Sequence, residues 1–155
     1  MLLADLVAAS SRVASTRSRL AKLRELAQCL RALDREEIAI GVMWLSGETQ
    51  QGKIGIGYAA VQQERPAPAT TPTLTLLAVD RAFSGIMATR GTGSASRRKQ
   101  QLDALLSRAT AEEQSFLLRL MVGELRQGAL AGLMVDAIAE AAKVPLAEVR
   151  RAAMY

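Results

Sequence analysis

The sequence predicts an all-α fold: one compact domain, residues 1–155, in which short and medium helices are joined by glycine- and proline-containing turns. Hydrophobic residues make up 50% of the chain but aromatic residues only 3%, so the core must consist mainly of aliphatic side chains. Ala, Leu and Met lose little side-chain entropy in a helix, and this composition therefore favours helices. Apolar residues also recur every three or four positions over much of the chain, as amphipathic helices require.

Three helical segments are predicted in the first part of the chain. Residues 16–33 carry leucines at helical spacing from Leu20 onward, with basic residues on the opposite face, and residues 2–8 fit a shorter helix before them. A third helix is expected after Asp34, because Glu37 follows it at the spacing of a capping box.

A proline-containing linker, residues 65–73, separates these helices from the second part of the chain. A short helix around residues 58–63 is expected before it. Apolar spacing and capping residues predict five helices after the linker. These cover residues 76–89, a segment that begins near Ser94, the residues from Thr110 to Gly123, residues 130–142, and a last helix that begins at Pro145.

The positive charge is concentrated in two segments of the chain. The net charge is +5, and a basic balance favours nucleic acid or another anionic surface as partner. Residues 1–33 contain six Lys or Arg against two acidic residues, and residues 81–108 contain six against one. The remainder of the chain contains eight against twelve. If folding brings the two basic segments together, they form one anion-binding face.

The composition disfavours several classes of protein. The chain has no histidine, which removes the commonest general base and the Ser-His and Cys-His nucleophile pairs. Cys29 is the only cysteine, so an intramolecular disulfide is impossible. No apolar run approaches the length of a membrane span, and the first residues lack the basic character of a secretory signal. We therefore expect a cytoplasmic protein that is not bound to a membrane.

The first candidate binding site is the start of the helix near Ser94. Thr92, Ser94 and Ser96 precede Arg97 in a run of small, hydroxyl and basic residues. The first N–H groups of a helix have no intrahelical partner and the helix dipole is positive there, so nearby hydroxyls and cations can complete a phosphate site. The spacing does not match a Walker A loop. The pattern is also typical of an ordinary helix cap beside a solvated charged turn.

A second candidate site combines Thr16, Ser18 and Lys22, which again place hydroxyls and a cation at a helix start. The alternative here is a solvated amphipathic face. Two such sites, one in each basic segment, favour DNA as the ligand, because DNA presents a long row of phosphates.

The third candidate site is the turn that contains Gly123, Arg126 and Gly128. Glycines allow backbone N–H groups to approach a ligand closely, and an arginine there can enter a minor groove or hold a phosphate. A helix C-cap followed by a tight interhelical turn would use the same glycines.

Two long segments of the sequence resemble a known family. Residues 83–106, from Phe-Ser-Gly-Ile-Met to the leucines after the basic run, are similar to part of the N-terminal DNA-binding domain of ATP-dependent DNA ligases, and so are residues 116–128. The opening Ala-Ser-Thr-Arg-Ser-Arg-Leu-Ala-Lys run and the Trp-Leu-Ser-Gly-Glu run fit the same family. The order and spacing resemble actinobacterial ligases similar to eukaryotic ligase I, and the resemblance covers essentially the whole chain.

The resemblance implies an all-helical, monomeric domain that binds nicked double-stranded DNA across the minor groove, mainly through sugar and phosphate. It implies a nucleoid-associated role in DNA replication, repair and recombination, beside a catalytic core in the same polypeptide. The residues expected to contact DNA are Thr16, Ser18, Lys22, Thr92, Ser94, Ser96, Arg97, Gly123, Arg126 and Gly128.

The chain departs from the ligase pattern in its lysines. The family's chemistry requires a lysine in a Lys-x-Asp-Gly motif, which takes the AMP group, and none of the four lysines here is followed by x-Asp-Gly. We therefore expect residues 1–155 to be truncated before the nucleotidyltransferase and OB-fold domains, and to be inactive alone. ATP and Mg²⁺ are expected in the parent protein, and no cofactor in residues 1–155. The alternative function is that of a helical protein-interaction domain.

Overall fold

The computed structural model describes the whole chain except residues 53, 55, 57–63, 126–127 and 155. The described residues form α-helices and no strand beyond one isolated bridge between Leu2 and Thr75, so the predicted all-α class is confirmed. The helices are α1 (Leu3–Ser15), α2 (Arg19–Arg31), α3 (Ile38–Leu45), α5 (Leu76–Ala88), α6 (Ser94–Ser107), α7 (Ala111–Val122), α8 (Gly128–Ala142) and α9 (Leu146–Ala153), with a 3-10 turn, η1 (Arg35–Glu37), before α3.

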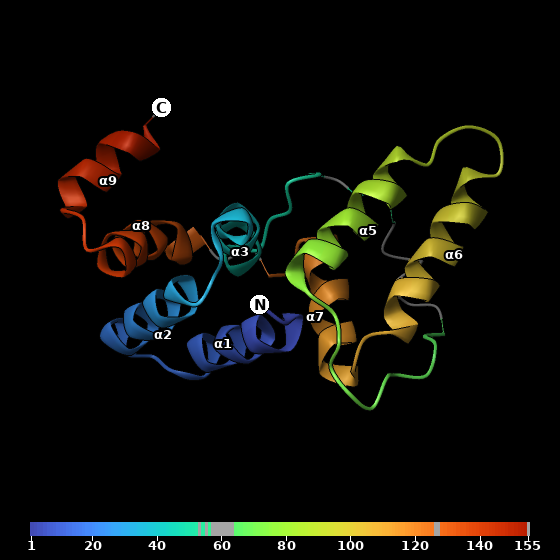
Figure 1. The fold of residues 1–155 in the computed structure, drawn as a ribbon, viewed down its shortest axis with the longest axis horizontal. Coiled ribbons are helices and arrows are strands. Elements are labelled where there is room, and N and C mark those ends of the chain that lie inside the picture. Colours follow the sequence, from blue (N-terminus) through green and yellow to red (C-terminus); the bar gives the residue numbers. More distant parts are fainter. Residues whose placement is uncertain (53, 55, 57–63, 126–127, 155) are drawn as a thin grey trace.

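The helices form an elongated arrangement. Helices α5 and α6 lie side by side at one end of the long axis, and α2, α8 and α9 lie at the other, with α1, α3 and α7 between them (Figure 1). No helix among the described residues is long and apolar enough to cross a membrane. The helix expected around residues 58–63 lies outside the described residues.

The helices of the second part of the chain match the predicted segments closely, whereas α1 is longer than predicted. Its buried face continues from Leu6 through Ala9 to Val13, at the spacing of one helix face, and this burial extends the helix to Ser15. The linker at residues 65–73 is confirmed as a segment without helix or strand.

The two predicted capping boxes are present. At α7, the Thr110 N–H donates to the Glu113 carboxylate at 2.9 Å, and the Glu113 N–H donates to the Thr110 hydroxyl at 3.3 Å. At η1, the Asp34 N–H donates to the carboxylate of Glu37 at 2.9 Å. Burial raises the pKa of Glu37, but hydrogen bonds from the Met1 ammonium and from Asp34, together with the ammonium charge, hold that pKa below its ordinary value.

The core contains an aromatic pair that packs the central helix α3 against α5 at one end of the molecule. Trp44 of α3 and Phe83 of α5 are at most 1% exposed, and their ring centroids are 5.7 Å apart with the planes tilted by 58°. This geometry is within the range that aromatic pairs prefer. Aliphatic side chains fill the rest of the core, as the composition indicated.

The apolar face that the leucine spacing indicates for α2 is not buried at Leu20. Its side chain is 55% exposed, whereas Leu26 and Leu30 on the same helix are buried. Helical spacing identifies which face of a helix is apolar, but it does not show where along the helix a neighbouring element begins to cover that face.

Candidate nucleic-acid interface

The start of α2 is fixed by two hydroxyl groups. The Ser18 hydroxyl accepts a hydrogen bond from the Ala21 N–H at 3.2 Å, and the Thr16 hydroxyl accepts one from the Ser18 N–H, also at 3.2 Å. A hydroxyl that accepts in this way still has its own proton to donate. Thr16 and Ser18 therefore hold the helix start in place and keep two O–H donors for an anion.

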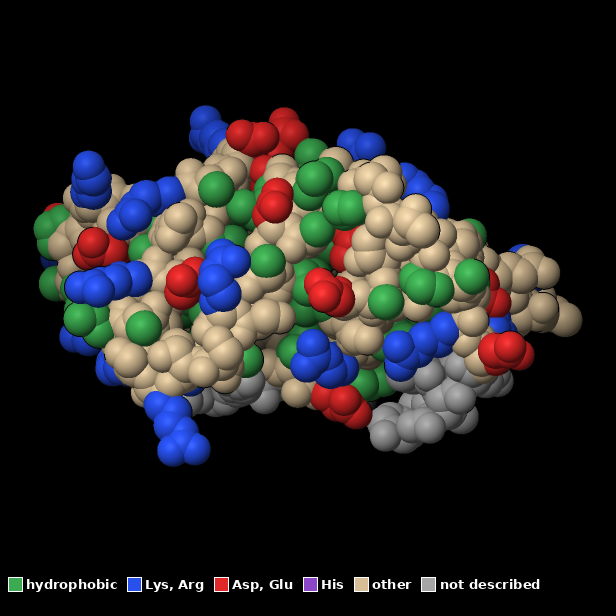
Figure 2. Space-filling view, turned by 90° about the horizontal axis from the view of Figure 1, so that it is seen from below, with side chains coloured by type: hydrophobic (Ala, Val, Ile, Leu, Met, Phe, Trp, Pro, Cys, Tyr) green, Lys and Arg blue, Asp and Glu red, His purple; other side chains and the backbone are tan. Residues whose placement is uncertain are grey.

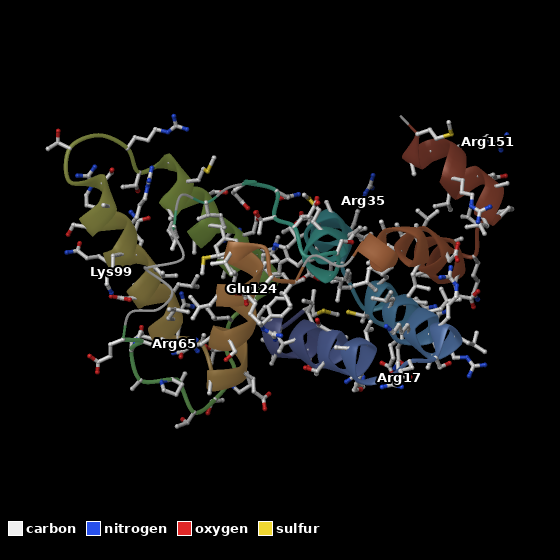
Figure 3. The ribbon with its side chains drawn as sticks, turned by 180° about the vertical axis from the view of Figure 1, so that it is seen from behind. Arg17, Arg35, Arg65, Lys99, Glu124 and Arg151 are labelled. Atoms are coloured by element: carbon white, nitrogen blue, oxygen red, sulfur yellow. The ribbon has the colours of Figure 1, made fainter. Side chains whose placement is uncertain are left out.

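Two cations beside this helix start have no carboxylate partner in the part of the chain that the structure describes. Arg12 pairs with Glu25 and Arg19 with Asp136, but neither Arg17 nor Lys22 forms an ion pair within the described residues. Arg17 is exposed and lies at the turn between α1 and α2 (Figure 3). Arg17 is not among the residues that the sequence analysis expects to contact DNA. Its position between Thr16 and Ser18, two expected contacts, was the feature that could have indicated it.

The start of α6 has no side-chain cap. The residue at its N-cap is Gly93, which has a left-handed φ of 75° and no side chain to occupy the first N–H groups. The N–H groups of Ala95 and Ser96 have no acceptor among the described residues. The hydroxyls of the predicted site residues Thr92 and Ser94 also form no hydrogen bond within the part of the chain that the structure describes.

The basic residues that follow this helix start form intramolecular contacts at the surface. Arg97 donates to the carbonyls of Thr92 and Arg90, Arg98 donates to the carbonyl of Thr89, and the Lys99 ammonium lies 2.8 Å from Asp103. Arg97 was expected to contact DNA directly. Its guanidinium folds back onto the preceding loop, which the sequence pattern could not show.

The third predicted site lies where α7 ends and α8 begins. Gly123 caps α7 with a left-handed φ of 79°, the backbone form that glycine adopts without strain, and Gly128 is the first residue of α8. Arg126 lies outside the described residues, so its contact with DNA stays a prediction from the sequence.

The three predicted sites do not form one compact cluster. The start of α6 lies at one end of the long axis and the start of α2 at the other, with the turn after α7 between them (Figure 1). In the view from behind, Glu124 of that turn lies between Lys99 of α6 and Arg17 (Figure 3). From below, basic side chains are distributed along the molecule with acidic ones among them (Figure 2). A ligand that met all three sites would therefore have to be extended.

Two features of the described residues concern metal binding and thiol reactivity. They contain no group of three or more His, Cys, Asp or Glu side chains that could hold a metal ion. Burial raises the pKa of the Cys29 thiol to about 11, with smaller effects from Arg12 and two carboxylates, so this side chain is a thiol at neutral pH and not a reactive thiolate.

Fold and site together define a helical domain with a candidate anion site near each end: the start of α2, with two cations that form no ion pair among the described residues, and the start of α6, which has no side-chain cap. The chain belongs to the family described as DNA ligase N terminus, whose model matches residues 47–139. Proteins named "Probable DNA ligase" are similar over 99% of this chain: 54% identical in Mycolicibacterium gilvum, 53% in Mycobacterium marinum and 51% in an Anaeromyxobacter species. The chain spans 30% of the length of each of these relatives. Their similarity includes α1 and α2, which the family model does not cover.

Proposed function

We propose that residues 1–155 bind duplex and nicked DNA without regard to base sequence, along the sugar-phosphate backbone that borders the minor groove. The domain then positions a nick for sealing by the catalytic core of an ATP-dependent DNA ligase. The observation that carries the proposal is the pair of helix starts at opposite ends of a ligase-family domain. Helix α2 begins beside Arg17 and Lys22, which form no ion pair among the described residues, and α6 begins without a side-chain cap.

The separation of the sites supports an extended ligand of regular charge. A duplex presents phosphates along its whole length, so it can meet helix starts that lie far apart, whereas a small anion can meet only one. Backbone N–H groups and hydroxyls bind phosphate oxygens and carry no sequence information, which suits an enzyme that must act on any nick. Such a protein would act in replication, repair and recombination and would be found on the nucleoid.

The catalytic role is assigned to a part of the protein beyond this domain. The family's ATP and Mg²⁺ do not fit the described residues, which lack a carboxylate cluster, and none of the chain's lysines lies in a Lys-x-Asp-Gly motif. We assign to residues 1–155, as a monomer, the task of holding DNA close to the core. Tethering of this kind raises the effective concentration of the nick to about the millimolar range.

The salt dependence of DNA affinity tests this function. Fluorescence anisotropy with a labelled nicked duplex should show log affinity falling linearly with log salt, by about 0.9 for each phosphate contact. Lys22→Ala should lower that slope by about 0.9, because one cation no longer displaces a counterion. A second duplex of scrambled sequence should bind equally well.

A helical protein-interaction domain is the alternative. Helix α9 has no buried residue, and Met154, at the C-cap that follows it, is 83% exposed, which is the observation that favours a docking role. An interface of that kind is mostly apolar and would respond weakly to salt. Absence of DNA binding by the wild-type domain would favour this alternative over DNA binding.

A further inference from the structure

Two successive arginines hold the loop between α5 and α6. Arg97 donates from Nη1 to the carbonyl of Thr92 and from Nη2 to the carbonyl of Arg90, each at 2.8 Å. Arg98 donates from Nε to the carbonyl of Thr89, also at 2.8 Å. Three carbonyls of the loop formed by residues 89–93 are thereby tied to the helix that follows them.

This loop depends on side chains because its backbone is permissive. It contains two glycines with left-handed φ angles, and glycine loses more conformational entropy than any other residue when its backbone is fixed. On the α5 side, the Thr89 hydroxyl donates to the Gly85 carbonyl at 2.9 Å and accepts from the Gln101 amide at 2.7 Å. On the side that leads into α6, the Arg97 guanidinium holds the loop through the carbonyls of Arg90 and Thr92.

We infer that Arg97 and Arg98 are positioning residues of the DNA interface and not phosphate ligands. They fix the loop in the conformation that leaves the first N–H groups of α6 open, so that the site is ordered before DNA arrives. A site ordered in advance binds more tightly because less entropy is lost on association. The inference rests on the proposed function and changes the role of Arg97 within it.

The shape of the guanidinium group makes the inference testable. Arginine presents a planar fork of donors that reaches two carbonyls at once, whereas lysine carries the same charge on a single nitrogen. A direct phosphate contact depends mainly on charge and would largely survive Arg97→Lys. A loop clamp depends on the fork and would be lost in Arg97→Lys as fully as in Arg97→Ala.

The experiment compares Arg97→Lys and Arg97→Ala with the wild-type domain in the anisotropy assay. We expect both variants to bind nicked duplex about tenfold more weakly. Each variant loses two charged hydrogen bonds within the loop, and hydrogen bonds to water offset part of that loss. The slope of log affinity against log salt concentration should be the same for Arg97→Ala as for the wild type. Wild-type affinity for Arg97→Lys, together with a slope lower by about 0.9 in Arg97→Ala, would overturn the inference.

A second measurement needs no DNA. The Ser94 N–H donates to the Gly91 carbonyl at 3.1 Å across the loop, and its hydrogen exchange should accelerate in both Arg97 variants. Lys22→Ala, at the other end of the molecule, is the matched control and should leave this exchange rate unchanged. Unchanged exchange in Arg97→Lys would also overturn the inference. Failure of the wild-type domain to bind DNA would remove the proposed function, and the positioning role with it.

Discussion

Deletion of residues 1–155 from the full-length protein should lower its rate of nick sealing by about 100-fold or more, because the reacting ends are no longer held in register. Self-adenylation should continue, since none of the four lysines of this chain lies in the motif that takes AMP. Gel assays with radiolabelled ATP and with a nicked duplex measure the two steps separately. The contrast between them identifies a loss of DNA positioning.

The control is to supply the deleted domain as a separate chain. At micromolar concentration it should restore little sealing, because the tethered domain acts at an effective concentration of about a millimolar. Equal sealing rates for the full-length and the truncated protein would contradict the proposed role. Loss of adenylation on deletion would indicate that the domain supports the core itself.

The second large effect concerns the stability of the domain. Trp44→Ala should destabilise it by about 3–5 kcal/mol, because a side chain that is 1% exposed is removed from its contact with Phe83 and leaves a cavity. For a domain of this size, the midpoint of thermal unfolding should fall by about 10 °C. A circular-dichroism melt measures this shift.

Leu20→Ala is the matched control for Trp44→Ala. It also truncates a large hydrophobic side chain, but Leu20 is 55% exposed, so the free energy of unfolding should change by no more than about 0.5 kcal/mol. A large loss of stability in this variant would show that Leu20 is buried after all. A negligible effect of Trp44→Ala would contradict the position of the aromatic pair in the core.

The sequence predicted those features of the fold that depend on neighbouring residues. The capping boxes at Asp34 and Thr110 depend on two residues three positions apart, and both are present. The exposure of Leu20 depends on where α2 meets its neighbours, and spacing along one helix does not contain that information. The extent of α1 depended in the same way on tertiary burial of Val13.

The site was predictable in its parts but not in its arrangement. Hydroxyls and glycines indicated the starts of α2 and α6. In the structure the Ser18 hydroxyl caps α2, whereas Gly93 stands at the N-cap of α6 and provides no side-chain cap. The sequence could not show that the two starts lie at opposite ends of the molecule, nor that Arg97 turns back onto its own loop. The first fact depends on how segments distant in the sequence pack together, and the second on the conformation of the loop between α5 and α6.

An NMR titration of residues 1–155 with a nicked duplex tests the central claim most directly. If the two helix starts and the intervening turn bind one DNA backbone, amide resonances should shift together at residues 16–22, 92–96 and 123–128, at one common stoichiometry. Shifts confined to α8 and α9 around Val144, or shifts at only one of the two helix starts, would contradict an interface that extends along the domain.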